Sequence, residues 1–587
     1  MPDLRPRTLA LPLVAFALWL SSGCSPEARQ HAADERFRAV YEAEWRWRRE
    51  QLPGGEEDKP LADHLPKVDR ASEEARGAYW EETLRKVNAL TRADLSPAEQ
   101  VNYDIYRAQL QVLIDDQRFR DFEMPANSDS TFWTDLGYTA RRPFRSLTDY
   151  EHWIAQMRDI PRYFGEQMDE MRAGMKRGFT PPRVTLAGRD ASITAVTSAT
   201  PEASLFYTPF KDMPGIAADK QAALRAQALA TIRDVVQPAY LKLLDFMRNE
   251  YLPGTRTTLA AQALPDGRNY YRAKIREFTT LDMEPGAIHK YGVAEVERLH
   301  AAMLEQMHAT GFSGDFPQFL KFLRTDPRFY ARTPQELLMR AAWIAKVFDG
   351  KASTYFGYLP RARFAIKPVP EDLAPFYTAG RGGPGVYLLN TYDLPSRPLY
   401  NLAALTLHES APGHAFQIPI AMEHKSQPDF RRHSYISAYG EGWALYCEKL
   451  GEEMGMYETP YDRFGMLGYQ IWRAARLVVD TGVHAEGWTR EQAVNYLREY
   501  TALPEREIGT EVDRYIAWPG QALSYYLGER TILEGRARAE QALGEHFNLR
   551  AFHDAVLELG SVPLPVLTAR IDRFIAEGGK GPFPDVE

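Results

Sequence analysis

Residues 293–311 read VAEVERLHAAMLEQMHATG, and this stretch decides the fold class. Its apolar side chains return every three or four residues, as on one buried face of an α-helix. They are Val293, Val296, Leu299, Met303, Leu304 and Met307. Gly311 follows the last of them, where a helix commonly ends. The stretch predicts a long amphipathic helix.

Most of the remaining chain has the same character. Residues 218–250 and 529–545 show similar helical spacing, whereas β signals are few. The best β signal is GVYLLN at residues 385–390, where β-branched and aromatic residues lie between turn residues. We find no repeat and no convincing interdomain linker. The sequence therefore predicts a mainly α fold with a small β-sheet, built as one domain over residues 35–580.

The composition excludes several classes of protein. Of the 587 residues, 44% are hydrophobic and 26% are charged, which is ordinary for a globular protein and unlike a disordered or fibrous chain. The net charge of -8 argues against nucleic acid as a partner, since nucleic-acid binders usually carry a basic surface. Cys24 and Cys447 are too few for a disulfide scaffold or a multi-cysteine metal site.

The N-terminus is predicted to be a targeting signal. Arg5 and Arg7 precede an apolar run from Leu9 to Leu20, which is too short to span a bilayer and is typical of a secretory signal. LSSGC at residues 20–24 resembles a bacterial lipobox, so we expect residues 1–24 to be a signal peptide with a lipidated Cys24. Residues 25–34 would be a tether to a membrane. The alternative is an ordinary cleaved signal; in both cases the protein is exported to the cell envelope.

One glycine-rich motif is a false lead. GRGGPG at residues 380–385 fits the dinucleotide-binding pattern G-x-G-x-x-G. A dinucleotide loop must follow a strand and open a helix, so that the helix N-terminus meets the phosphates. Here the glycines precede the predicted strand instead. We reject a nucleotide site and predict no organic cofactor.

The reactive groups are in residues 405–414, which read LTLHESAPGH. Zinc favours imidazole and carboxylate ligands, so His408 and His414 are candidate ligands and Glu409 is a candidate general base. The second histidine comes six residues after the first, which would turn the two rings apart on a regular helix. Because Pro412 and Gly413 lie between them, a local bulge or kink could bring the rings together.

A third ligand is expected downstream. Residues 437–448 read SAYGEGWALYCE and place two carboxylates seven residues apart on one helix face. Glu441 follows His414 closely enough for one turn and a second packed helix, so we predict it as the third ligand. Glu448, two turns further on, would hydrogen-bond a ligand or form a salt bridge.

These motifs, HESAPGHAFQ followed by GEGWALY, resemble those of the bacterial "domain of unknown function 885" family. That family looks like a branch of the gluzincin metallopeptidases. Further matching blocks extend the resemblance over most of the chain: IHKYGVAEV at 288–296, RLVVDTGVH at 476–484, PGQALSY at 519–525 and FHD at 552–554.

The resemblance implies a role for each motif residue. His408, His414 and Glu441 would hold zinc, and Glu409 would be the general base. Tyr525 would donate to the oxyanion, with its neighbour Tyr526 as the alternative. The strand at 386–390 looks like the gluzincin edge strand, whose backbone could pair with a peptide, so Tyr387 and Asn390 are candidate substrate-binding residues.

Three further residues are candidates for substrate binding. His484 could bind substrate or cap a helix, and His553 could bind substrate or be structural. Arg473 could hold a substrate carboxylate, although Arg473 and Arg476 could equally pair with the buried Asp480. The resulting hypothesis is an exported zinc metallopeptidase that cleaves peptides. The alternatives are a metal-dependent hydrolase of a non-peptide amide or ester, and a non-catalytic surface binding lipoprotein.

Overall fold

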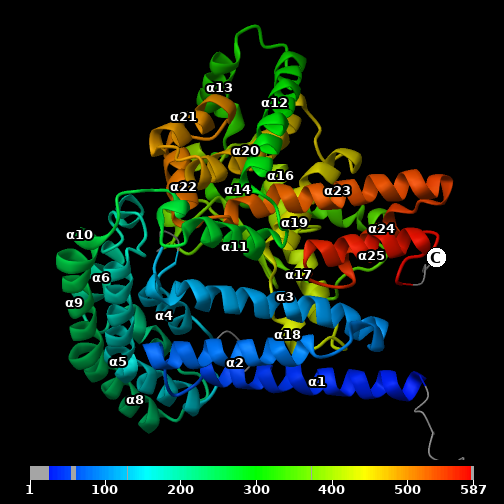
Figure 1. Ribbon diagram of the computed structural model, residues 1–587. Helices are drawn as coiled ribbons and strands as arrows, with labels where there is room; N and C mark the ends of the chain where they lie inside the picture. The colour runs from blue at the N-terminus through cyan, green and yellow to red at the C-terminus, as the bar shows by residue number, and fades with distance from the viewer. Residues whose placement is uncertain (1–25, 54–60, 128–129, 372, 584–587) are drawn as a thin grey trace, which may run out of the picture.

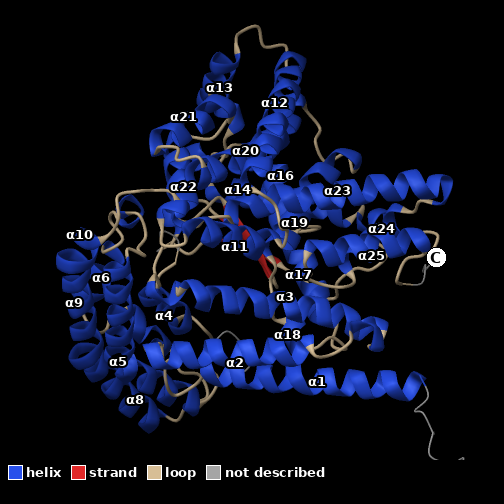
Figure 2. Ribbon diagram, in the orientation of Figure 1, coloured by secondary structure: helices blue, strands red, loops and turns tan. Residues whose placement is uncertain are grey.

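The computed structural model describes residues 26–53, 61–127, 130–371 and 373–583 (Figure 1). The chain is mainly helical with one small sheet, which confirms the predicted fold class (Figure 2). The predicted signal peptide and Cys24 lie outside the described residues. Within the described residues, no helix has the length and apolar character needed to cross a membrane.

The helices of the first half of the chain are α1 (Pro26–Gln51), α2 (Arg70–Asn88), α3 (Pro97–Phe119), α4 (Phe132–Ala140), α5 (Leu147–Arg177), α6 (Ala191–Ser198), α7 (Thr208–Lys211), α8 (Ala218–Thr231), α9 (Gln237–Phe246), α10 (Leu252–Gly254), α11 (Gly267–Thr279), α12 (Pro285–Ala309), α13 (Phe316–Thr325), α14 (Pro334–Asp349) and α15 (Ala352–Tyr355). The second half contains α16 (Leu402–Glu409), α17 (His414–Glu423), α18 (Asp429–Arg432), α19 (Ser437–Glu453), α20 (Pro460–Ala485), α21 (Arg490–Tyr500), α22 (Glu505–Ala517), α23 (Ser524–Leu543), α24 (Leu549–Leu557) and α25 (Leu564–Ala576).

The helix predicted at residues 293–311 is α12. It begins at Pro285, whose fixed φ suits the first helical position, and it packs along α20. Its apolar face is buried at Val296, Leu299, Met303 and Met307, as the spacing predicts.

The structure differs from a free tether at residues 26–34. These residues form the first turns of α1, and Ala33 and Asp34 are already buried. The Asp34 carboxylate accepts a hydrogen bond from the backbone N–H of Ser96 at 2.9 Å, which fixes this end of α1 against the start of α3. Alanine favours helix, so a segment of small residues continues the helix here. The extent of the single domain at 35–580 stays a prediction.

The hydrophobic residues gather in two clusters. The larger cluster joins α1–α3 to the helices from α11 onward and contains the sheet. The smaller cluster fills a side lobe, which we define as helices α4 to α10 with residues 61–65. In Figure 1 the helices of this lobe lie together at the left of the molecule.

The sheet is short and lies in the middle of the molecule (Figure 2). Its strands are β1 (Ala365–Pro368), β2 (Gly380–Gly383) and β3 (Val386–Leu389), in the order β1-β3-β2. The predicted strand at 385–390 is therefore confirmed as β3. The G-x-G-x-x-G glycines form a hairpin, because β2 pairs antiparallel with β3 and opens no helix. This geometry agrees with rejecting a nucleotide site.

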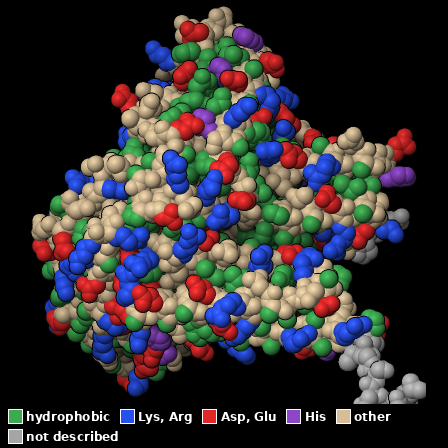
Figure 3. Space-filling model, viewed as in Figure 1, with side chains coloured by type: hydrophobic (Ala, Val, Ile, Leu, Met, Phe, Trp, Pro, Cys, Tyr) green, Lys and Arg blue, Asp and Glu red, His purple; other side chains and the backbone are tan. Residues whose placement is uncertain are grey.

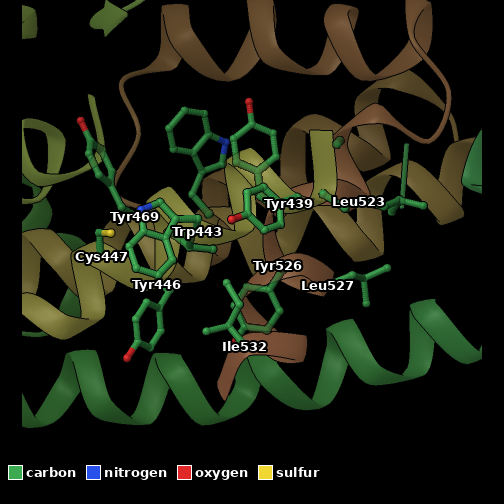
Figure 4. Packing of buried hydrophobic residues seen from close by; sticks show 14 of the residues in the cluster. Tyr439, Trp443, Tyr446, Cys447, Tyr469, Leu523, Tyr526, Leu527 and Ile532 are labelled. Atoms are coloured by element: carbon green, nitrogen blue, oxygen red, sulfur yellow. The ribbon is translucent and has the colours of Figure 1, made fainter. Parts of the chain in front are cut away.

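Helix α19 is the centre of the larger cluster. Figure 4 shows Tyr439, Trp443 and Tyr446 of α19 packed among residues of α20 and α23. The polar atoms of these rings are also used, because the Tyr439 hydroxyl donates to the carbonyl of Val556 at 2.8 Å. These contacts hold helix α19 in place and so position the side chains that it presents to α16.

On the face shown in Figure 3, acidic and basic side chains are interspersed.

Candidate metal centre

The first two candidate ligands come from two separate helices. Helix α16 ends at Glu409 and α17 begins at His414, so the helix is broken between the histidines. The expected bulge or kink within one helix is therefore wrong. The break forms because the Ser410 hydroxyl donates to the carbonyl of Thr406 at 2.6 Å and the Gly413 N–H donates to that of Leu407 at 3.0 Å. These bonds end α16 and turn the chain back over it.

Gly413 is required where the chain turns back. A Cβ atom at this position would lie 1.8 Å from the carbonyl oxygen of His408, so only glycine allows the contact. From the other side, the indole N–H of Trp443 donates to the carbonyl of Pro412 at 2.8 Å. The turn is thus fixed both to α16 and to α19, and His414 is placed beside His408.

The structure brings the three predicted ligands together. The Nε2 atom of His408 lies 3.5 Å from Glu441 Oε2, and the Nε2 atom of His414 lies 3.4 Å from the same oxygen. The two imidazole rings stand nearly perpendicular, with centroids 4.9 Å apart. One ligand atom from each residue lies within 4.8 Å of the others, so these side chains could hold a metal ion.

The second carboxylate of α19 binds the outer nitrogen of His408. The Oε1 atom of Glu448 lies 2.7 Å from His408 Nδ1, and Glu448 is fully buried. When the ring is neutral and Nδ1 carries the hydrogen, the lone pair of Nε2 faces Glu441 and His414. The two glutamates of α19 therefore contact opposite nitrogens of one ring.

The charges of the cluster shift the pKa values of its members. Burial raises the pKa of Glu441, but the neighbouring His414 and His408 outweigh it and hold that pKa well below the usual range. Burial lowers the pKa of His408. Its hydrogen bonds to Glu441 and Glu448 outweigh burial and raise that pKa to about 10. The cluster therefore favours a positive charge between these side chains.

Glu409 lies at the edge of the cluster beside β2. Its side chain is half-buried, and its Oε2 atom accepts a hydrogen bond from the N–H of Gly382 at 2.6 Å. The expectation that the strand at 386–390 is the edge strand is wrong, because β3 is the central strand and β2 is the edge next to α16. The Gly380–Gly383 hairpin arm takes this position because it folds back on β3.

The neighbouring tyrosines Tyr525 and Tyr526 have different partners. Tyr525 was expected, and its ring stacks on that of His408 with centroids 6.5 Å apart. Tyr526 is wrong as an alternative, because its hydroxyl donates to Glu295 at 2.6 Å on α12.

Tyr435 was missed. Half of its surface is exposed, and its hydroxyl lies so close to α19 that a Cβ on Gly440 would be 2.4 Å away. It also interacts with Glu441, Tyr525 and Glu409. Only the small residue before Glu441 hinted at such a contact.

The strand residues Tyr387 and Asn390 do not face a substrate. Tyr387 is fully buried beneath the sheet. The Asn390 amide nitrogen donates to the carbonyls of Ala374, Tyr377 and Thr378, while its oxygen accepts from a backbone N–H. Tyr387 is thus held within the protein, and Asn390, which follows the end of β3, is used up by backbone groups of residues 374–392. As substrate-binding candidates they are wrong.

The two distant histidines are structural. His484 is fully buried; its Nδ1 accepts from the N–H of Ala261 at 3.1 Å and its Nε2 donates to the carbonyl of Tyr515 at 2.8 Å. His553 is fully buried between the Tyr446 hydroxyl at 2.7 Å and a backbone carbonyl at 2.8 Å. Neither ring has a nitrogen left for a substrate, so these candidates are wrong as well.

Arg473 lies close to the cluster but within the protein. Its guanidinium stacks on Trp472, 3.9 Å from the ring centroid, and lies 5.7 Å from that of Tyr525. The expected pairing with Asp480 is wrong, because Asp480 accepts instead from Tyr271 at 2.5 Å and from a backbone N–H. Arg476 pairs with Glu511 at 2.9 Å. Partners from other helices thus replace the pairing within α20.

A cavity of about 240 Å³ lies beside α16. Leu402 and Leu405 line it from α16, about two turns and one turn before Glu409 respectively, and Leu389 lines it from β3. Charged groups reach it from Arg397 and Glu507, and burial raises the pKa of Glu507 to about 7. The cavity lies along the first part of α16, and Glu409 and the three candidate ligands are not among its lining residues.

Comparison with known proteins identifies the family. Residues 52–571 match the family described as "Bacterial protein of unknown function (DUF885)". The chain belongs to this family. No curated protein matches the chain.

Two solved structures are similar to the DUF885 chain. One is a "putative lipoprotein" from Colwellia psychrerythraea, with 26% identity and a TM-score of 0.86 over 94% of this chain and 99% of the other. The second is a "putative lipoprotein of unknown function" from Shewanella oneidensis, with 16% identity and a TM-score of 0.64 over 93% of this chain and 99% of the other. The second likeness concerns the fold alone.

Proposed function

We propose that this DUF885 protein is a zinc-dependent hydrolase that cleaves peptide bonds. The supporting observation is the spacing of the donor atoms. Zinc bonds of about 2.0–2.1 Å at tetrahedral angles put two donors about 3.3 Å apart. Glu441 Oε2 lies 3.5 Å from His408 Nε2 and 3.4 Å from His414 Nε2. Two imidazoles and one carboxylate are also a ligand set that leaves a catalytic zinc an open position.

The residues around the cluster have complementary roles in this proposal. Zinc supplies Lewis-acid polarisation of the substrate carbonyl. Glu409 takes the proton of the attacking water and passes it to the leaving amine. Glu448 orients the His408 ring through Nδ1. The hydroxyls of Tyr525 and Tyr435 donate to the oxygen on which negative charge develops.

Peptide is the proposed substrate because an edge strand lies at the cluster. Strand β2 pairs with β3 on one side only, so its other edge can pair with an extended peptide. These features, with the broken His-Glu…His helix and the downstream Glu441, support a gluzincin-like mechanism.

Export and a lipid anchor complete the proposal. The apolar leader and the LSSGC segment support cleavage before Cys24 and lipidation of that residue. The two similar structures are described as "putative lipoproteins", which agrees with this localisation. The enzyme would thus act in the cell envelope.

Metal analysis combined with two variants tests the function. We expect about one zinc per chain and cleavage of a mixed peptide library by the wild type. Glu409→Gln keeps zinc but loses on the order of 10²–10⁴ in kcat, because glutamine cannot accept the proton. Glu441→Ala loses zinc and activity together. Zinc content that is unchanged in Glu441→Ala contradicts the ligand set.

The substrate panel separates the alternatives. If the protein hydrolyses esters or non-peptide amides but cleaves no peptide, its substrate belongs to that other class. Zinc binding without hydrolysis of any substrate supports a binding lipoprotein instead.

A further inference from the structure

The exposed face of the sheet carries a cation next to Glu409. In β2, Gly380 and Gly382 face α16, because Cβ atoms on them would approach Glu409 Cγ at 3.7 Å and Glu409 O at 1.8 Å. Side chains alternate along a strand, so Arg381 between them points from the opposite face. There it shares a cross-strand row with Leu388 of β3 and Lys367 of β1.

The surroundings of Arg381 are polar but supply no paired anion. Arg381 is exposed, and its guanidinium interacts with the hydroxyls of Tyr377 and Tyr138 and, more weakly, with Glu409. Tyr138 lies on α4 of the side lobe and is 62% exposed. Among the described residues, no carboxylate forms an ion pair with Arg381, and Glu409 Oε2 is bound by the Gly382 N–H. Arg381 thus contacts tyrosine hydroxyls of the sheet region and of the side lobe, without a paired carboxylate among the described residues.

We propose that Arg381 binds a carboxylate group of the substrate, with the Tyr377 and Tyr138 hydroxyls as additional donors. This inference rests on the proposed peptidase function and specifies its substrate class. A guanidinium has a planar set of donors that matches a carboxylate, and a bound carboxylate replaces the missing counter-charge. Since Arg381 adjoins Gly382, which contacts Glu409, that carboxylate lies a short distance from the scissile bond.

Two parts of a peptide carry the required carboxylate. It is either the C-terminal carboxylate or the side chain of an aspartate or glutamate near the scissile bond. Four forms of one peptide distinguish them: free acid or C-terminal amide, each with glutamate or glutamine beside the cleaved bond. The measurements are kcat and KM of the full-length zinc enzyme for each form.

We expect the wild type to prefer one carboxylate-bearing form by about 10–100-fold in kcat/KM, the usual worth of a charge-assisted contact. Arg381→Gln removes that preference mainly through KM, with unchanged zinc content, and Arg381→Lys retains part of it. Lys367→Gln is the matched control, because it removes a cation from the same sheet face two strands away and should leave the preference intact.

Three outcomes overturn the inference. A wild type that cleaves all four forms equally well refutes it while leaving the peptidase function intact. A preference that survives in Arg381→Gln refutes it in the same way. A wild type with zinc that cleaves none of the forms or other peptides refutes the peptidase function and this inference together. If Arg381→Gln fails to fold, the wild-type series and Arg381→Lys decide the matter.

Discussion

The turn between the two histidines allows a sharp test, Gly413→Ala. An added Cβ would lie 1.8 Å from His408 O, and ordinary contact begins at 3.4 Å. The turn or the last turn of α16 must therefore move by about 1.6 Å. All three nearest atoms belong to the backbone of His408 and Leu407, so no side chain can rotate away to relieve the contact.

The displacement changes the position of His408 relative to His414. Metal–ligand distances tolerate about 0.2 Å, and a 1 Å misplacement in an active site can cost about 100-fold. We expect zinc affinity and activity to fall by at least about 100-fold. Overpacking of this kind typically costs about 1–3 kcal/mol of stability, so the variant should still fold. Competition with a chelator measures the affinity, and thermal unfolding measures the stability.

Gly165→Ala is the matched control. Gly165 lies inside α5, and a Cβ there would meet nothing within 4 Å. We expect it to leave zinc affinity unchanged and to stabilise the protein by about 0.4–1 kcal/mol. If Gly413→Ala binds zinc as tightly as this control, the close turn does not position the histidines and the reasoning is refuted.

Three further predictions concern the second carboxylate, acid stability and the membrane anchor. Glu448→Gln should weaken zinc binding by about 10–100-fold in a chelator titration, because it removes the negative charge of the carboxylate that contacts His408 Nδ1. An unchanged zinc affinity contradicts this prediction. Burial lowers the pKa of His484 to about 3, so its stabilising neutral form is complete above pH about 6.5 and is lost as pH falls towards 3. Urea unfolding at several pH values measures the free energy of unfolding. Between pH 6 and 4 this free energy should change less steeply with pH in His484→Gln than in the wild type, by up to about 1.4 kcal/mol per pH unit, and an equal pH dependence in both proteins contradicts the prediction. Mass spectrometry of the mature protein should find acyl groups on Cys24, whereas a product starting after Cys24 without acyl mass excludes the anchor.

The sequence predicts what depends on neighbours along the chain. The 3.6-residue spacing of 293–311 is enough to predict α12, and β-branched and aromatic residues between turn residues are enough to locate β3. The three residues that converge in space were also identified, because histidine and glutamate are residue types that zinc favours as ligands. Proline and glycine indicated that the helix could not remain regular.

The sequence misleads where a partner comes from a distant segment. The position of β3 in the centre of the sheet depends on β1 and on the returning hairpin arm β2, which no local pattern specifies. Arg476 and Asp480 are four residues apart and looked like a pair, but Glu511 and Tyr271 from other helices are the partners. Tyr435 could not be found because its position depends on the free space above Gly440.

The convergence of possible ligand atoms supports the proposed metal site. When the His408 ring is neutral and its hydrogen lies on Nδ1 beside Glu448, Nε2 presents a lone pair towards the carboxylate of Glu441. His414 Nε2 faces the same oxygen at 3.4 Å. Acceptors this close repel one another unless a positive charge lies between them. A proton can satisfy only one pair of the three atoms at a time, whereas a metal ion accepts all three lone pairs at once. If the cluster holds a metal ion, removing one ligand, as in Glu441→Ala, should release that ion. If the cluster holds a proton instead, the wild type should bind zinc no more tightly than the Glu441→Ala variant.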